Sequence, residues 1–129
     1  MLKRRIIFIV VVIMLVALVW GIGSGMMMRT DVYLERFTVS EDGKEITLEV
    51  AVTSSAGYVR AVADRSDSPE RQELYFYSAF GGLNGSIAAT DKFVIPINND
   101  CEEIYFYQIG GFELVLKKDP ATNQWTKMD

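Results

Sequence analysis

The N-terminus constrains this chain more than any other stretch. Three basic residues, Lys3, Arg4 and Arg5, precede residues 6–28, a run of 23 residues without a charged side chain. At about 1.5 Å of rise per residue, a helix of this run is roughly 34 Å long and can cross a hydrocarbon core of about 30 Å. We therefore predict a signal anchor or transmembrane helix in residues 1–28 and a single folded domain in residues 29–129.

Two interpretations of the first segment remain open. A retained signal anchor keeps the basic residues in the cytoplasm and makes a single-pass membrane protein whose domain lies outside the cell. A signal peptide is instead cut after a small residue, and residues 21–23 or 23–25 offer such a site. Trp20 at the edge of the apolar run suits a membrane interface, and the three methionines at 26–28 extend the run, so we favour retention. The glycines at 21, 23 and 25 predict a flexible exit from the membrane.

Charge and composition exclude several kinds of function. The chain carries 13 basic and 17 acidic residues, so without Lys3, Arg4 and Arg5 its net charge is −7, which argues against a nucleic-acid partner. Histidine is absent, which removes nucleophile systems built on Ser-His-Asp or Cys-His and most zinc sites. Cys101 is the only cysteine, so no intrachain disulfide forms. We expect its thiol to be buried or idle rather than part of an intermolecular bridge.

From residue 31 onward, apolar and polar residues alternate with a period of two, which is typical of strands. The clearest run is residues 46–52, and further strands are expected at residues 32–39, 58–62, 73–78, 87–97, 103–108 and 112–117. Pro96 lacks an amide donor and predicts an edge position or a bulge. About seven short strands with no amphipathic helix predict an all-β fold: a small antiparallel β-sandwich of immunoglobulin-like class, preceded by one N-terminal transmembrane helix.

The alternation also assigns faces and turns. One face of the strand at residues 32–39 is expected to carry Tyr33, Phe37 and Val39, and one face of the strand at residues 112–117 is expected to carry Phe112, Leu114 and Leu116. Breaks are expected at residues 54–57 and at the glycine-rich residues 81–86.

One motif occurs twice. Residues 73–77 (ELYFY) and residues 103–107 (EIYFY) are each followed by a Gly-Gly pair. If the two strands are neighbours, one sheet surface presents four tyrosines: Tyr75, Tyr77, Tyr105 and Tyr107. Such a surface is a candidate binding face, because tyrosine offers rigid contact area and a hydrogen-bonding tip. The alternative is purely structural, since cross-strand pairs stabilise a sheet by about 0.2–1 kcal/mol each.

No residue pattern points to a cofactor, a metal or catalysis. Asp64, Asp67 and Glu70 offer oxygen ligands for calcium, but their spacing matches no EF-hand loop and arginines lie among them, which favours a solvated loop. Hydrolysis by paired carboxylates requires two groups at a defined separation, and the sequence places no such pair. We therefore predict no catalytic, cofactor-binding or metal-binding residues and expect that the protein is not an enzyme.

Four segments carry a resemblance: residues 54–60 (SSAGYVR), 76–84 (FYSAFGGLN), 104–107 (IYFY) and 113–119 (ELVLKKD). In them the chain resembles small exported or membrane-anchored β-domain proteins of Gram-positive, clostridia-type bacteria. That resemblance implies a location outside the cytoplasm and no particular activity.

These observations predict a membrane-anchored, extracytoplasmic and non-catalytic interaction domain of the bacterial cell envelope. Its expected partners are the lipid bilayer, through residues 6–28, and another envelope protein. The alternatives are an accessory subunit whose helix is the contact, a secreted domain after signal cleavage, and a hydrolase with two facing carboxylates in a deep pocket.

Overall fold

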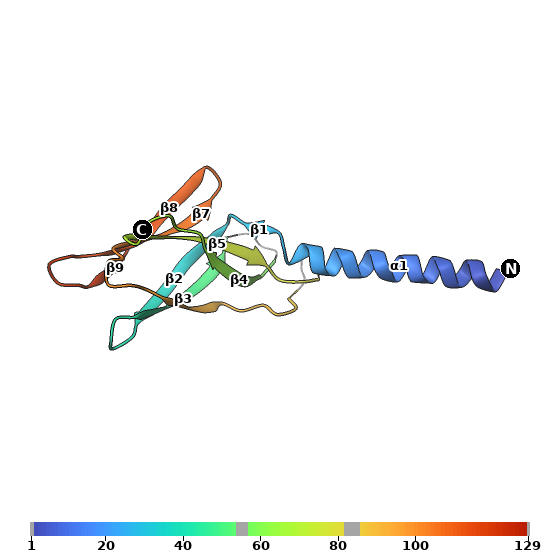
Figure 1. Cartoon of the computed structure of the whole chain (residues 1–129), viewed down its shortest axis with the longest axis horizontal. Helices are drawn as coiled ribbons and strands as arrows, with labels where there is room; N and C mark the ends of the chain where they lie inside the picture. The colour runs from blue at the N-terminus through green and yellow to red at the C-terminus, as the bar shows by residue number, and fades with distance from the viewer. Residues whose placement is uncertain (1, 54–56, 82–85, 129) are drawn as a thin grey trace.

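The N-terminal helix stands apart from the rest of the molecule. In the computed structural model, which describes residues 2–53, 57–81 and 86–128, helix α1 (Leu2–Ser24) projects from one end of a β domain (Figure 1). The segment Leu2–Gly23 is long and apolar enough to cross a membrane, and its apolar window has no part buried inside the protein. The predicted apolar helix is therefore confirmed in length and composition.

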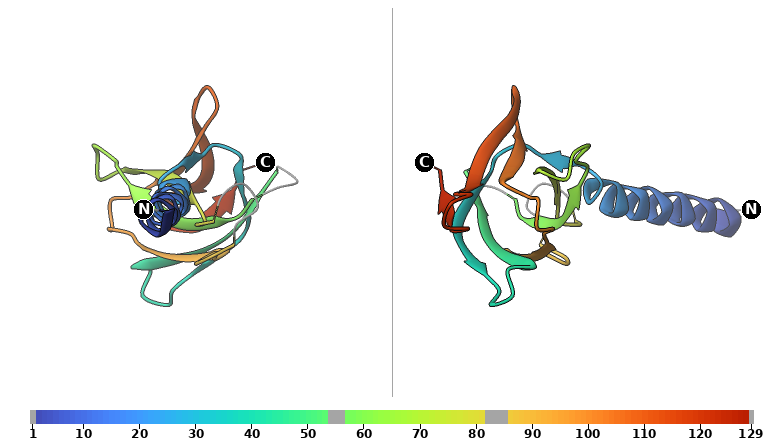
Figure 2. Two further views of the ribbon diagram at one scale, coloured as in Figure 1. Left: turned by 90° about the vertical axis from the view of Figure 1, so that its right-hand side faces the viewer. Right: turned by 60° about the vertical axis from the view of Figure 1, so that its left-hand side comes forward.

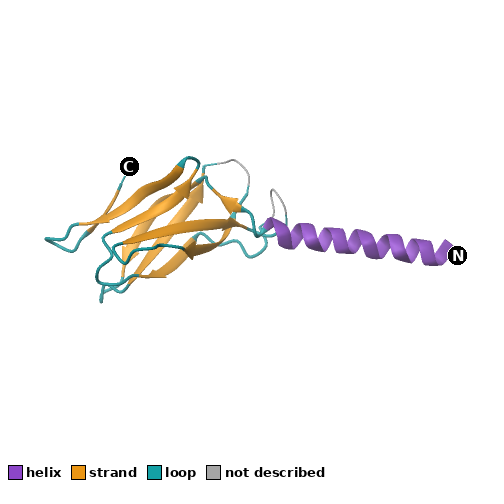
Figure 3. Ribbon diagram, turned by 45° about the horizontal axis from the view of Figure 1, so that its top comes forward, coloured by secondary structure: helices purple, strands orange, loops and turns teal. Residues whose placement is uncertain are grey.

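Two sheets pack face to face to form the domain (Figures 1 and 3). The larger sheet contains β1 (Met28–Arg29), β4 (Val59–Asp64), β5 (Arg71–Ser78), β7 (Glu103–Gln108), β8 (Gly111–Lys118) and β9 (Trp125–Lys127). The smaller sheet contains, in spatial order, β2 (Val32–Val39), β3 (Glu45–Val52) and β6 (Lys92–Pro96). The prediction of a β-sandwich preceded by one helix is confirmed.

Strand β5 organises the larger sheet. It pairs antiparallel with β4 along one edge, while its other edge carries β7 beside Arg71–Leu74 and β1 beside Phe76 and Tyr77. The β5–β7 pair is parallel, whereas the sequence predicted an antiparallel sandwich. The reason is the path of the chain: it leaves β5, forms β6 in the facing sheet and returns to β7, so β5 and β7 run in the same direction.

An aromatic contact joins the two sheets at the centre of the core. The ring of Phe76 on β5 lies 4.7 Å from that of Phe106 on β7 and 5.6 Å from that of Phe93 on β6, measured between ring centroids. Phe76 and Phe106 are fully buried. Two glutamine side chains add polar links between the sheets, since the Nε2 of Gln72 donates to the carbonyl of Pro96 and that of Gln108 to the carbonyl of Val32.

Two β-bulges change which side chains face the core. The register of β2 against β3 shifts between Leu34 and Arg36, so Val32 and Leu34 point inward and Tyr33 is 43% exposed. The prediction that Tyr33 shares a face with Phe37 and Val39 is therefore wrong, although Phe37 and Val39 do pack on the core. A bulge adds one residue to one strand and inverts the alternation beyond it.

The second bulge lies at Val115 on β8. Ile104 pairs with Leu116 and the next residue, Tyr105, pairs with Leu114, so Val115 is the extra residue. Leu116 is fully buried in the core, while Leu114 lies opposite Tyr105 on the outer side of the sheet. The predicted common face of Phe112, Leu114 and Leu116 is therefore wrong.

Other predicted strands agree in part. The strand expected at residues 87–97 is shorter, because Ala88 has a positive φ of 63° and regular pairing begins only at Lys92. Phe93, Ile95 and Ile97 share the buried face, and Pro96 lies on β6 at the edge of the smaller sheet, as predicted. The expected breaks at residues 54–56 and 82–85 lie outside the described residues.

The junction between helix and domain differs from the predicted flexible exit. Gly25 is buried, and a Cβ at this position would collide with the ring of Phe80. The Nη2 of Arg60 on β4 donates to the Gly25 carbonyl oxygen at 2.6 Å, and its guanidinium lies 4.4 Å from the centre of the Phe80 ring. Because α1 has no basic residue in its last turn, Arg60 supplies the positive charge that the helix C-terminus favours.

The bulge at Val115 predicts unequal effects of two similar substitutions. Leu116→Ala is expected to lower the free energy of unfolding by about 2–5 kcal/mol, because it leaves a cavity in a packed core. Leu114→Ala removes a half-buried side chain from the outer face and is expected to lower it by less than about 1 kcal/mol. Urea unfolding of the full chain in detergent micelles measures both values, and equal losses would mean that β8 has no bulge.

Candidate functional site

The structure brings the four predicted tyrosines to one surface. Tyr75 and Tyr77 on β5 and Tyr105 and Tyr107 on β7 alternate with core residues, and all four are half-buried on the outer side of the larger sheet. Because β5 and β7 are neighbours in parallel register, the rings of Tyr75 and Tyr107 stack with centroids 4.8 Å apart and planes 24° apart. The geometric condition for a shared tyrosine surface is therefore met.

A fifth ring completes this surface. Phe112 on β8 meets Tyr75 and Tyr107 edge-on, at centroid distances of 5.5 and 5.3 Å. The sequence placed Phe112 on the same face as Leu116, and the bulge at Val115 is the reason that it lies outside. We call these five residues the aromatic face: Tyr75, Tyr77, Tyr105, Tyr107 and Phe112.

Charged side chains contact the tyrosines at the edges of the aromatic face. The guanidinium of Arg65 lies 5.0 Å from the centre of the Tyr75 ring, and its Nη2 donates to the Tyr77 hydroxyl oxygen at 2.5 Å. The guanidinium of Arg71 lies 4.3 Å from the centre of the Tyr105 ring and forms an ion pair with Glu73 at 3.2 Å. The alternation of β5 places Arg71 on the same face as Tyr75, whereas Arg65 follows the end of β4 and nothing in its spacing indicated that it reaches the tyrosines.

Tyr105 is the electrostatically perturbed member of the aromatic face. Its hydroxyl donates a hydrogen bond to the Oε2 of Glu103 at 2.7 Å. That bond raises the pKa of the Tyr105 phenol above its usual value, and burial and the negative charge of Glu103 act in the same direction. Loss of the proton would place a phenolate beside a carboxylate, so the arrangement favours the neutral phenol.

The arrangement suits recognition by a preformed surface. Ring stacking and edge-on contacts contribute about 0.5–1.5 kcal/mol per pair and restrict the rotamers of the side chains involved. A partner then meets ordered rings whose side-chain entropy has already been reduced by folding. The same contacts stabilise the sheet, so the two interpretations of the tyrosines are compatible in this geometry.

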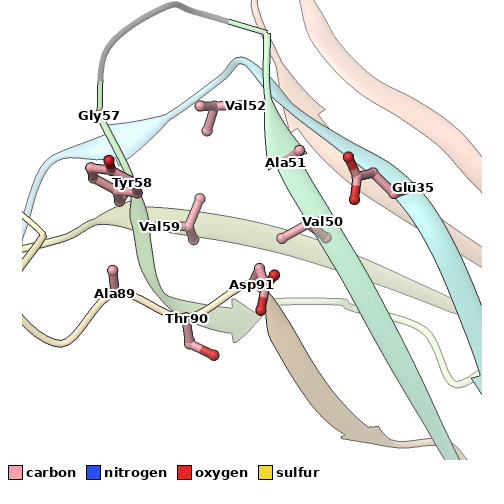
Figure 4. Close-up of a pocket in the computed structure, with 10 residues that line it drawn as sticks. All are labelled: Glu35, Val50, Ala51, Val52, Gly57, Tyr58, Val59, Ala89, Thr90 and Asp91. Atoms are coloured by element: carbon pink, nitrogen blue, oxygen red, sulfur yellow. The ribbon is translucent and has the colours of Figure 1, made fainter.

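A cleft lies on another side of the domain (Figure 4). It has a volume of about 480 Å³ and opens between β3, the start of β4 and the segment before β6. Its apolar lining includes Val50, Val52 and Val59, and two exposed carboxylates, Glu35 and Asp91, lie at its margin. In Figure 4 these carboxylates lie on opposite sides of the β3 ribbon, so the cleft does not bring them face to face. The bulge of β2 gives no sequence signal, so the position of Glu35 was not predicted.

Two of the three acidic residues that the sequence offered as calcium ligands have local partners. Asp64 accepts a hydrogen bond from the Ser66 hydroxyl at 2.7 Å, and Glu70 accepts one from Ser68, which lowers the pKa of the Glu70 carboxyl. Within residues 2–53, 57–81 and 86–128, no group of three or more potential ligands lies in a position to hold a metal ion. Cys101 is fully buried, and this burial raises the pKa of its thiol.

Comparison of the chain with protein-family models, with curated proteins and with solved structures finds no match. The immunoglobulin-like class of the sandwich and the resemblance to exported clostridia-type proteins therefore stay predictions. Function has to be argued from the residues of this chain.

The Tyr105–Glu103 bond predicts a pH-dependent effect. A raised folded-state pKa stabilises the protein below about pH 10, the pKa of an unfolded tyrosine, and this contribution is lost as the pH rises through the folded-state value. Glu103→Gln removes the charge next to the phenol, so the pKa of Tyr105 is expected to fall toward its ordinary value. Ring-labelled tyrosine NMR in detergent micelles measures the titration.

The matched control is Glu41→Gln, which makes the same charge change in an exposed turn. It is expected to leave the Tyr105 titration unchanged. An unaltered Tyr105 pKa in Glu103→Gln would contradict the assigned hydrogen bond.

Proposed function

We propose that this protein is a single-pass membrane-anchored binding domain of the cell envelope, held by α1 and recognising a protein partner through the aromatic face. The observation that carries the proposal is the cluster of five rings on the outer side of the larger sheet. Aromatic residues are enriched in the buried centres of protein interfaces, and tyrosine in particular combines apolar area with a polar tip. Arginine, which is also enriched there, flanks the cluster at positions 65 and 71.

Retention of α1 is part of the proposal. Gly25 lies at one of the possible cleavage positions, yet its backbone is held by Arg60 and covered by Phe80. These contacts support a helix that stays attached to the folded domain. Lys3, Arg4 and Arg5 before the apolar run support a cytoplasmic N-terminus and an extracytoplasmic domain.

A non-catalytic role follows from the same residues in this proposal. The chain has no histidine, and the carboxylates at the margin of the cleft are exposed and lie apart. The aromatic face provides contact area rather than a reactive group. Binding is therefore the function for which this geometry offers the most support.

The proposal predicts that single substitutions in the aromatic face abolish partner binding without unfolding the domain. Tyr107→Ser breaks the stack with Tyr75, and Tyr77→Ser removes the hydroxyl that Arg65 contacts. Each is expected to abolish binding of the partner. Cross-linking in native membranes captures that partner, and mass spectrometry identifies it. Each is also expected to lower the melting temperature by only a few degrees, because no core ring is lost.

The matched control is Tyr33→Ser. Tyr33 is also a partly exposed strand tyrosine, but it belongs to the smaller sheet. This variant is expected to retain partner binding. Capture that survives Tyr77→Ser and Tyr107→Ser, or collapse of the fold in either variant, would refute the aromatic face as a binding surface.

A further inference from the structure

The end of the domain next to α1 carries exposed apolar side chains. Met26 and Met27 follow the helix and are 68% and 65% exposed, while Tyr58 and Ile87 are 52% and 66% exposed. We call these four residues the proximal patch. Exposed apolar side chains that lie close together on a protein are typical of an interaction surface.

Backbone contacts bring the four residues of the proximal patch to the same end of the domain. The carbonyl of Met27 accepts a hydrogen bond from the Ser78 amide at 2.9 Å, and that of Tyr58 accepts one from the next amide along the chain, Ala79, at 2.8 Å. Ile87 forms an isolated antiparallel bridge with Phe80, whose ring covers Gly25 at the end of α1. In Figures 1 and 2 the chain around these residues lies where the helix meets the sandwich.

The junction holds the end of α1 close to the sandwich. Two backbone bonds close the helix end, from the amide of Gly25 to the carbonyl of Ile22 and from that of Met26 to Gly23. Arg60 then ties Gly25 to β4 across 35 positions of sequence. With so short a connection, a bilayer crossed by α1 ends within a few residues of the end of the sandwich that carries the proximal patch.

Two arginines also lie at this end of the domain. Arg29 and Arg60 are both located here, and the Arg29 guanidinium lies against Gly57 next to Tyr58. The carboxylate of Asp31 pairs with Arg29 at 2.8 Å. The charge of Arg29 is therefore offset by Asp31, and Arg60 lies beside the C-terminus of α1.

We propose that the sandwich is docked on the bilayer that α1 crosses, with Met26, Met27, Tyr58 and Ile87 seated among the lipid head groups. At this depth, aromatic and apolar side chains leave water and contact the membrane interface, where tyrosine is enriched. The inference rests on the proposed membrane anchoring by α1. Docking fixes the orientation of the domain relative to the bilayer, so the aromatic face is held at the side of the domain.

The test places a fluorescent probe on the full chain in phosphatidylcholine vesicles that contain head-group-proximal nitroxide lipids. Cysteine is introduced by Ile87→Cys, with Val94→Cys as a matched control, because Val94 is also apolar and 60% exposed but lies on β6. Ala121→Cys marks the turn between β8 and β9, at the end of the domain far from α1 (Figure 1). Cys101 is fully buried, so the wild-type chain controls for unwanted labelling.

Docking predicts that nitroxide lipids quench the probe at position 87 several-fold more strongly than the probes at 94 and 121, with a blue-shifted emission at 87 alone. Met27→Cys, which labels a second position of the patch, is expected to behave like position 87. Equal, weak quenching at 27, 87, 94 and 121 would overturn docking. Protection at 87 that increases with protein density and shows no lipid quenching would overturn it in favour of a second copy of the chain.

Extraction at alkaline pH separates failure of this inference from failure of the proposed function. A chain that stays in the vesicles but shows no quenching at 27 and 87 is anchored without docking, so only the inference fails. A chain that alkaline carbonate releases from the vesicles is not anchored by α1, and both proposals then fail.

Discussion

The uncovered apolar surface of α1 is the constraint on which the rest of the molecule depends. A helix that is apolar on every side has to be surrounded by an apolar environment, and the domain does not provide one. Among the residues that the structure describes, the buried core is formed by the sandwich and the loop before β7, and the apolar window of α1 has no part in it. A bilayer is the environment that matches the length and composition of this helix.

The sandwich is stabilised by its own core, so it does not depend on α1 for its packing. Phe76 contacts one ring in its own sheet and one in the facing sheet, so a single side chain links β5, β7 and β6. The same crossover that places β6 opposite β5 makes β5 and β7 parallel neighbours. Core packing and the aromatic face therefore have a common origin in the path of the chain between its two similar motifs.

Local alternation predicted much of this structure, and non-local geometry accounts for what it missed. A period of two gives the inward residues of β3, β5 and β7. It also places Tyr75, Tyr77, Tyr105 and Tyr107 on the outward side of their strands. The bulges at Glu35 and Val115 depend on how neighbouring strands meet, so Tyr33 and Phe112 were assigned to the wrong faces. The ring contacts of Arg65 and the cap of Arg60 on Gly25 join distant residues, and no spacing rule indicates them.

The most direct test asks on which side of the membrane the sandwich lies. Ala121→Cys supplies an exposed thiol at the end of the domain far from α1, while Cys101 stays buried. A membrane-impermeant maleimide applied to intact cells is expected to label position 121 without permeabilisation, and the labelled chain is expected to remain in the membrane fraction at full length. Labelling that requires permeabilised cells would place the sandwich in the cytoplasm and contradict an anchored extracytoplasmic domain.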